Sequence, residues 1–286
     1  MTNLKEIAKE IREILEIKRK EINLTFEEST HTYTMNDLNG KPKNNWVSVS
    51  GVIKKFYEPF DSEGIADRKA KGDPIEKARL LKEWSDAGDY STNLGSRTHY
   101  LLEKKSLEMF GLDKEVRQPE FECDFTQILK SDSMVTAGTN FLELMKERGG
   151  ELLDTEIVLG CPDLSYVGQP DKMWLFLDKN GENIGFVTTD YKTNKPKNFE
   201  MNQFTKPMYS PFEKHPNNSL GHYFIQLPLY SKLLLKMLEN TKYGHIKLLG
   251  CIIVLLKEDS TFEEFRVPKD VINTILNMDV KKYLKN

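Results

Sequence analysis

Residues 166–193 read YVGQPDKMWLFLDKNGENIGFVTTDYKT, two apolar runs on either side of a short polar turn. The turn is centred on Gly181, and aromatic and β-branched residues are frequent in both runs, which is typical of an antiparallel pair of strands. Asp171 stands near the start of the first predicted strand and Asp190 at the end of the second. Because the two acids lie at similar distances from the turn, we expect the pairing to bring them close together.

Two neighbouring carboxylates repel each other unless a positive charge lies between them. A divalent cation with oxygen ligands, Mg²⁺ or Mn²⁺, is the usual solution. Lys192 follows Asp190 by two residues and so points to the same face of the strand. A metal, two acids and a lysine form a working set for phosphodiester hydrolysis. These residues alone leave open a structural Asp–Lys pair at a strand end, beside an unrelated turn aspartate.

The rest of the chain predicts an α/β (α+β) fold with a central mixed β-sheet flanked by helices. The first half should contain a helix over 4–15, a hairpin over 31–50 that turns at Asn39–Gly40, and helices over 51–90, 94–110 and 125–148, with breaks at Pro59, Gly72–Pro74 and Gly88. Strands over 152–160, 166–178 and 184–193 and an irregular loop over 194–218 should follow. The chain should end with a helix over 222–238, in which Pro228 makes a kink or marks the first turn, strands over 246–256 and 262–268, and a C-terminal helix.

This order predicts one domain over residues 1–286. Its parts are an N-terminal helix and hairpin (1–50), a helical lobe (51–150) and a catalytic core (151–286). A net charge of −3 excludes a generally basic nucleic-acid coat, so any nucleic-acid surface must be a local patch. No apolar stretch approaches the length of about 20 residues that spans a membrane, and the N-terminus lacks a secretory pattern. We therefore expect a cytoplasmic protein, bacterial or in a phage-infected cell, without a membrane partner.

Several short motifs occur in the order typical of one nuclease superfamily. They are LGSRTHYLLE (94–103), with Gly95, His99 and Glu103 in a G-x-x-x-H-x-x-x-E pattern; an upstream acid, Glu156; VGQPD (167–171), a G-x-x-D element; DYK (190–192), a (D/E)-x-K element; and QLPLY (226–230), a Q-x-x-x-Y element. In these residues the chain resembles the PD-(D/E)XK nucleases, in their RecB-type and phage-exonuclease branch. Residues 31–34 and 46–61 are similar to the start of phage exonucleases and of the mitochondrial genome maintenance exonuclease.

The resemblance implies a restriction-endonuclease-like core and a set of metal ligands. Asp171 and Asp190 would bind Mg²⁺ or Mn²⁺, together with the backbone carbonyl of Tyr191. His99 would be a further ligand, as in RecB-type relatives. Glu156 would bind the metal or a water molecule beside it.

The resemblance also implies the remaining catalytic roles. Lys192 would position or activate the attacking water, and Gln226 and Tyr230 would orient Lys192 or contact the nucleic acid near the cut. Pro228 departs from a regular helix in this last element and weakens its assignment. Some relatives use four cysteines for an iron–sulfur cluster; this chain has three, at other spacings, so we expect no cluster.

The stretch KTNKPKNFEMNQFTKPMY (192–209) mixes lysines with aromatic residues. Phosphate neutralisation and base stacking require such a mixture, although a solvated loop would look similar. We predict DNA contacts here at Lys195, Lys197, Phe199 and Lys206. Further candidates are Arg97, in the His99 motif, and Ser48 and Ser50, which are alternatively ordinary strand or turn residues.

The sequence therefore predicts a metal-dependent DNA exonuclease of phage-type recombination, replication or repair. Its substrate would be DNA that is single-stranded or has free ends, and a recombinase, helicase or single-strand-binding protein is a possible partner. The alternatives are a structure-specific endonuclease, a catalytically silent nuclease fold that binds DNA or a partner, and an α/β protein with coincident motifs.

Overall fold

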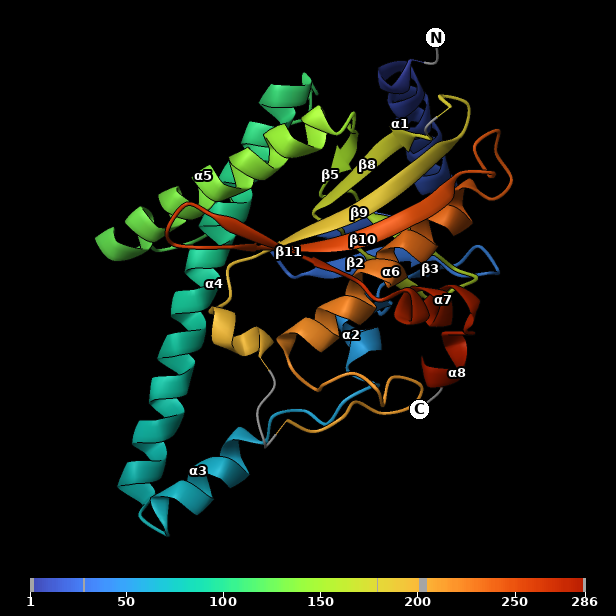
Figure 1. The fold of residues 1–286 in the computed structure, drawn as a ribbon. Helices are drawn as coiled ribbons and strands as arrows, with labels where there is room; N and C mark the ends of the chain where they lie inside the picture. Colours follow the sequence, from blue (N-terminus) through green and yellow to red (C-terminus); the bar gives the residue numbers. More distant parts are fainter. Residues whose placement is uncertain (1–2, 28, 179, 201–204, 285–286) are drawn as a thin grey trace.

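The centre of the fold is a five-stranded mixed sheet in the order β11-β10-β9-β8-β5. It is seen in a computed structural model that describes residues 3–284 except 28, 179 and 201–204 (Figure 1). Strands β9 and β10 are parallel, and the other neighbouring pairs are antiparallel. The strands span Glu151–Thr155 (β5), Lys172–Leu177 (β8), Ile184–Lys192 (β9), Lys247–Leu256 (β10) and Phe262–Arg266 (β11).

Helices cover both faces of this sheet, as Figure 1 shows. On β10, Cys251, Ile253 and Leu255 join a core with helices α1 (Leu4–Glu21), α2 (Val49–Ile53), α6 (Ser219–Leu238) and α7 (Lys269–Asn277). The alternate residues Ile252, Val254 and Leu256 join a second core with α4 (Pro74–Phe110) and α5 (Phe125–Glu147). Burial on both faces explains why β10 is a continuous apolar run. The predicted mixed sheet flanked by helices is thus confirmed.

Helix α4 is the longest element, with 37 residues, and it continues through Gly88, where we expected a break. It begins at Pro74, capped by the Asp73 side chain, and ends at Gly111 in a left-handed conformation. A single glycine costs a helix only about 1 kcal/mol, which the packing of α4 on α3 (Ser62–Ala70) and on α5 offsets. The N-terminal part of α4 packs on α3 away from the sheet, and these two helical segments form a projecting arm. The rest of α4 links this arm to the core (Figure 1).

Two small sheets complete the β structure. Strands β1 (Thr25–Glu27), β2 (Thr32–Asn36) and β3 (Pro42–Lys43) form one, and β4 (Val47–Ser48), β7 (Tyr166–Gly168) and β6 (Leu159–Cys161) form the other. The hairpin predicted over 31–50 is therefore right for β2 and β3 but wrong from Val47 on, because β4 pairs with β7 in the other sheet and the chain then turns into α2. The short elements Pro196–Phe199 (η1) and Lys281–Leu284 (α8) are helical.

Two predicted strands are interrupted. The strand expected over 152–160 breaks at Glu156, whose backbone is left-handed with φ 48°. The strand expected over 166–178 divides into β7 and β8 at Gln169–Asp171. In each case the first and second halves belong to different sheets, so the polar residues at the break lie where the sheets diverge.

Pro228 lies inside α6, well beyond its first turn. Asn218 caps this helix by accepting a hydrogen bond from the backbone of Gly221. Within the described parts of the chain, none of the helices combines the length and the apolar character needed to cross a membrane.

Candidate metal centre

Three acidic residues lie at the same end of the sheet: Glu156 follows β5, Asp171 precedes β8, and Asp190 is near the end of β9. The pairing of β8 with β9 runs through Lys172 opposite Thr189, so Asp171 and Asp190 follow as the next residues on the two strands. The backbone N–H of Glu156 donates to the backbone oxygen of Asp171 at 3.0 Å, which places Glu156 directly after β5 on the other side. The antiparallel pairing predicted from the sequence is confirmed, and it brings the acids to one edge of the sheet.

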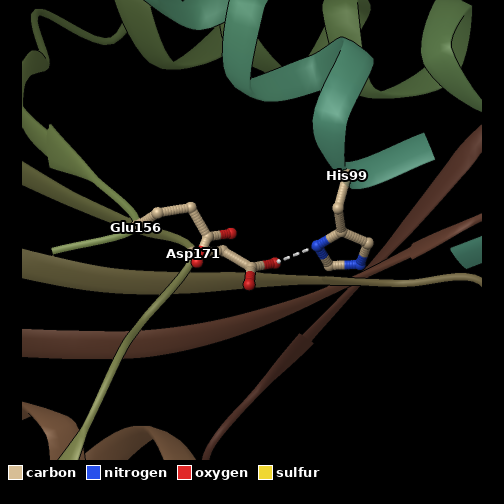
Figure 2. Close-up of side chains that lie close together, drawn as sticks. All are labelled: His99, Glu156 and Asp171. Atoms are coloured by element: carbon tan, nitrogen blue, oxygen red, sulfur yellow. Dashed lines mark ion pairs between the residues drawn. The ribbon is translucent and has the colours of Figure 1, made fainter. Parts of the chain in front are cut away.

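His99 reaches this edge from α4. Its Nδ1 lies 3.2 Å from Oδ2 of Asp171. One ligand atom from each of His99, Glu156 and Asp171 lies within 4.8 Å of the other two, and Figure 2 shows the imidazole facing the two carboxylates. Helix α4 passes close to the residue after β9 here: a Cβ at Gly95 would lie 3.4 Å from Oγ1 of Thr193, an ordinary van der Waals distance. The helix motif and the strand motifs therefore meet in space.

Asp171 is held in the ionised form. Its burial opposes ionisation, but His99, and then Lys192 and Lys172, keep the pKa of its carboxyl well below the usual range. The backbone N–H of Tyr191 also donates to its Oδ2, at 2.7 Å. Asp171 is thus a fixed anion at the centre of the group.

Glu156 and Asp190 behave in the opposite way. Burial, and then repulsion from Asp171, raise the pKa of Glu156. The same two causes raise the pKa of Asp190 to about 7. Acids crowded around an ionised neighbour gain most from a cation placed among them, because it removes both the repulsion and the cost of burying their charge.

Lys192 contacts Oδ2 of Asp190 and lies 4.4 Å above the ring of Tyr223. Burial disfavours its charge, but Asp190 and Asp171 outweigh this and raise the pKa of Lys192. The lysine is therefore a cation at neutral pH. A cationic lysine can hold a water molecule or a phosphate oxygen, and it cannot take a proton from water.

Gln226 and Tyr230 lie on α6, one turn apart, and Nε2 of Gln226 donates to the Tyr230 hydroxyl at 3.0 Å. Asp190 contributes to the raised pKa of Tyr230, after burial, so the pair adjoins the acids. Neither side chain makes a hydrogen bond to Lys192 in the described structure. Oε1 of Gln226 is buried and has no hydrogen-bond partner among the described residues.

Gly168, the glycine of VGQPD, allows the close packing behind Asp171. A Cβ at this position would lie 2.5 Å from Cε1 of Tyr230 and 2.7 Å from Cγ2 of Val49. Real Cβ atoms do not approach other atoms so closely, so this strand position requires glycine.

Lys172 was not among the predicted site residues; it follows Asp171 and is only 2% exposed. Its Nζ lies 4.6 Å from the centre of the Tyr191 ring. Burial lowers its pKa, although Asp171, Glu156 and Glu103 favour its charge. The sequence signal for its burial was its position at the start of an apolar strand.

Two of the lysines predicted to contact DNA are accessible. Lys195 and Lys197 are exposed and line a hollow of about 750 Å³ beside Tyr90 and Lys130. Lys206 is also exposed, but its Nζ is paired with Glu58 at 2.5 Å.

The other predicted DNA contacts have structural partners. Phe199 is 7% exposed and packs against Tyr223 and Phe265, so it belongs to the core and presents no ring to a base. Arg97 is paired with Asp132 at 2.8 Å and joins α4 to α5. Ser48 caps α2 through its hydroxyl, whereas Ser50 is exposed on that helix.

Comparison of the chain with protein-family models, and with curated proteins, found no match. The assignment of function therefore depends on the site itself.

Proposed function

We propose that the protein is a metal-dependent deoxyribonuclease with a core of the PD-(D/E)XK, restriction-endonuclease-like type. One observation carries the proposal. His99, Glu156 and Asp171, from α4 and two strand ends, converge within 4.8 Å. Asp190 and Lys192 lie directly beside them on β9. Convergence of residues so far apart in the sequence is not expected of coincident motifs.

The donor atoms fit Mg²⁺ or Mn²⁺. Carboxylate oxygens suit both ions, and an imidazole nitrogen fits Mn²⁺ better than Mg²⁺. The raised pKa values of Glu156 and Asp190 fit a cation as well. Buried Lys172 attracts both of these acids and Asp171, but the pKa values of Glu156 and Asp190 stay above their usual range all the same. When bound, such an ion would polarise a phosphate oxygen and make a bound water more acidic.

The chain's own residues have distinct roles in this proposal. Lys192 holds the attacking water and offsets the negative charge that develops on the phosphate. The Tyr191 N–H fixes the orientation of Asp171. The unpartnered Oε1 of Gln226 accepts a hydrogen bond from the water or from the substrate.

We favour an exonuclease over the alternatives. The chain carries nothing that resembles a separate sequence-reading module, which a sequence-specific endonuclease would use. A silent nuclease fold is disfavoured because Asp171, Asp190 and Lys192 are all present and adjacent. End-dependent degradation suits phage-type recombination, replication or repair.

Incubation with labelled DNA tests the proposal. Linear single-stranded, linear double-stranded and covalently closed circular DNA are each incubated with Mg²⁺, Mn²⁺ or EDTA. We expect metal-dependent loss of the linear substrates alone, abolished by Lys192→Ala and retained by Lys20→Ala, an exposed lysine on α1. Nicking of the circles would favour the endonuclease. DNA binding without cleavage in either metal would favour the silent fold.

A further inference from the structure

His99, Glu156 and Asp171 are together called the metal group below. A cleft of about 570 Å³ opens from this group on the His99 side. It lies between α4, the β1–β2 hairpin and residues 114–119. His99 and Glu156 line it, so whatever occupies the cleft is adjacent to the proposed reaction centre.

Aromatic side chains form a second part of the lining of the cleft. Its walls carry three aromatic residues, Phe26, His31 and Tyr100, none of which has a role in the metal group. Phe26 lies 4.5 Å from Tyr33 and 5.1 Å from His31, ring centre to ring centre, which fixes its ring in place. Tyr100 follows His99 on α4, and so its position relative to the metal group is fixed by the helix.

Charges are distributed unevenly along the cleft. The acids Glu103 and Glu156 belong to the metal group and its surroundings, with Lys114 3.9 Å from Glu103. Arg117 stands on the segment 114–119 with 69% of its side chain exposed, 4.0 Å from Glu27. One exposed acid, Glu115, lies on the same segment. The aromatic residues are thus accompanied by a cation of the kind that contacts phosphate.

The size of the cleft limits its occupant. A volume of about 570 Å³ is in the range of pockets that bind one small ligand, about 300–1,000 Å³. It accommodates one or a few unpaired nucleotides and is too small for a duplex. Aromatic rings beside a cation are the usual means of binding single-stranded DNA, since every base has a face that can stack.

We propose that this cleft binds the terminal, unpaired nucleotide of a DNA strand, with its base on Phe26 and Tyr100 and its backbone toward Arg117. This inference rests on the proposed nuclease function and specifies its substrate as a single-stranded end. It also assigns a binding role to Phe26 and Arg117, which lie outside the nuclease motifs, and to Tyr100, at an x position of the His99 motif.

A binding cycle tests the assignment separately from catalysis. Unlabelled octathymidylates, either intact or with an abasic residue at the 5′ or the 3′ end, compete with an internally labelled octathymidylate in Ca²⁺. Fluorescence anisotropy gives the affinities, and a gel checks that the probe is intact. The proteins are the wild type, Phe26→Ala, Tyr100→Ala and the control Phe60→Ala, an aromatic residue that is 69% exposed and packs on Trp84 of the arm.

For the wild type, loss of the base at one end is expected to weaken binding by about five- to tenfold. Phe26→Ala and Tyr100→Ala should bind the intact strand as weakly as the wild type binds the strand with that abasic end. Loss of the same base should not weaken the binding of these two variants any further. The control should behave like the wild type. Independent effects of variant and abasic end, or equal effects of Phe60→Ala, would overturn the assignment. Phe26→Leu, which keeps the packing on Tyr33, separates loss of stacking from misfolding.

The cycle also distinguishes this inference from the proposed function. Coupling between the variants and one abasic end, in a protein that cleaves no DNA with Mg²⁺ or Mn²⁺, would retain the cleft and reject the nuclease. Metal-dependent cleavage without such coupling would retain the nuclease and reject the cleft.

Discussion

The backbone N–H of Tyr191 donates to Oδ2 of Asp171 at 2.7 Å and so ties the end of β9 to the residue that precedes β8. In a strand, the N–H and C=O of one residue face the same neighbour. By this rule the carbonyl oxygen of Tyr191 is expected to face Asp171 as well, as the proposed role of this carbonyl as a metal ligand requires. The acid is thus positioned by the main chain as well as by the imidazole of His99.

Mn²⁺ should stabilise the fold through His99 and Asp171. At 100 times its dissociation constant, a bound ligand adds about 2.7 kcal/mol to the free energy of unfolding. A protein of this size should then melt several degrees higher, about 2–4 °C for each kcal/mol. His99→Ala or Asp171→Asn should remove most of this shift, as measured by calorimetry. His245→Ala, an exposed histidine, is the control; an equal shift in all four proteins would reject the site.

Lys192→Ala should lower kcat by about 10²- to 10⁴-fold, because the cation acts on the reacting groups. KM for DNA should change little, since Lys192 is mostly buried and, in the proposed function, acts at the cut and not along the strand. Steady-state kinetics on a linear substrate gives both constants. A variant that raised KM and left kcat unchanged would assign Lys192 to binding alone.

Gly168→Ala should destabilise the protein by about 1–3 kcal/mol, because the new methyl group overlaps Tyr230 and Val49. Gly88→Ala is the matched control. No atom lies within 4 Å of the Cβ that it would add, so it should stabilise α4 by about 0.5–1 kcal/mol. Urea unfolding measures both changes, and a neutral Gly168→Ala would contradict the described packing of β7 on α6.

His222 should make the fold sensitive to acid. Burial lowers its pKa from the ordinary 6.5 to about 4, and its ring stacks on Tyr57 at 3.8 Å. Between these two pH values the unfolded chain binds a proton that the folded chain excludes, so stability falls as the pH drops from about 6.5 to about 4. Below that range the loss from this residue is complete.

Replacing the imidazole checks this. The free energy of unfolding of His222→Gln should decrease less than that of the wild type between pH 6.5 and pH 4. His245→Gln serves as the control for the loss of a histidine. Parallel curves for the wild type and His222→Gln would show that the ring is protonated as easily in the folded protein as in the unfolded chain.

The sequence predicted the part of the site that depends on local pattern. Turn residues around Gly181 and apolar runs of matched length determine the β8–β9 pairing, and from this pairing the meeting of Asp171 and Asp190 follows. His99 was placed by a helix motif, and the structure brings it to Asp171. The strand pairing depends on short-range spacing, which can be read from the sequence, whereas the place of His99 in the site was implied by the resemblance to the nuclease family.

What the sequence did not predict depends on tertiary packing. The continuation of α4 through Gly88 reflects packing on α3, which no local propensity encodes. The burial of Phe199 and Lys172 is likewise set by residues distant in the chain. Glu156 was expected within a strand, but the chain changes sheets there and the backbone adopts a left-handed conformation.

His99 is the one member of the metal group that does not come from the sheet edge. A cation held by all three side chains would therefore join α4 to the sheet as a cross-link does. Separation of that helix from the sheet would release the ion, and binding of the ion would oppose the separation. Chelation should accordingly increase amide hydrogen exchange in the middle of α4 more than in β10, whose pairing does not depend on the ion.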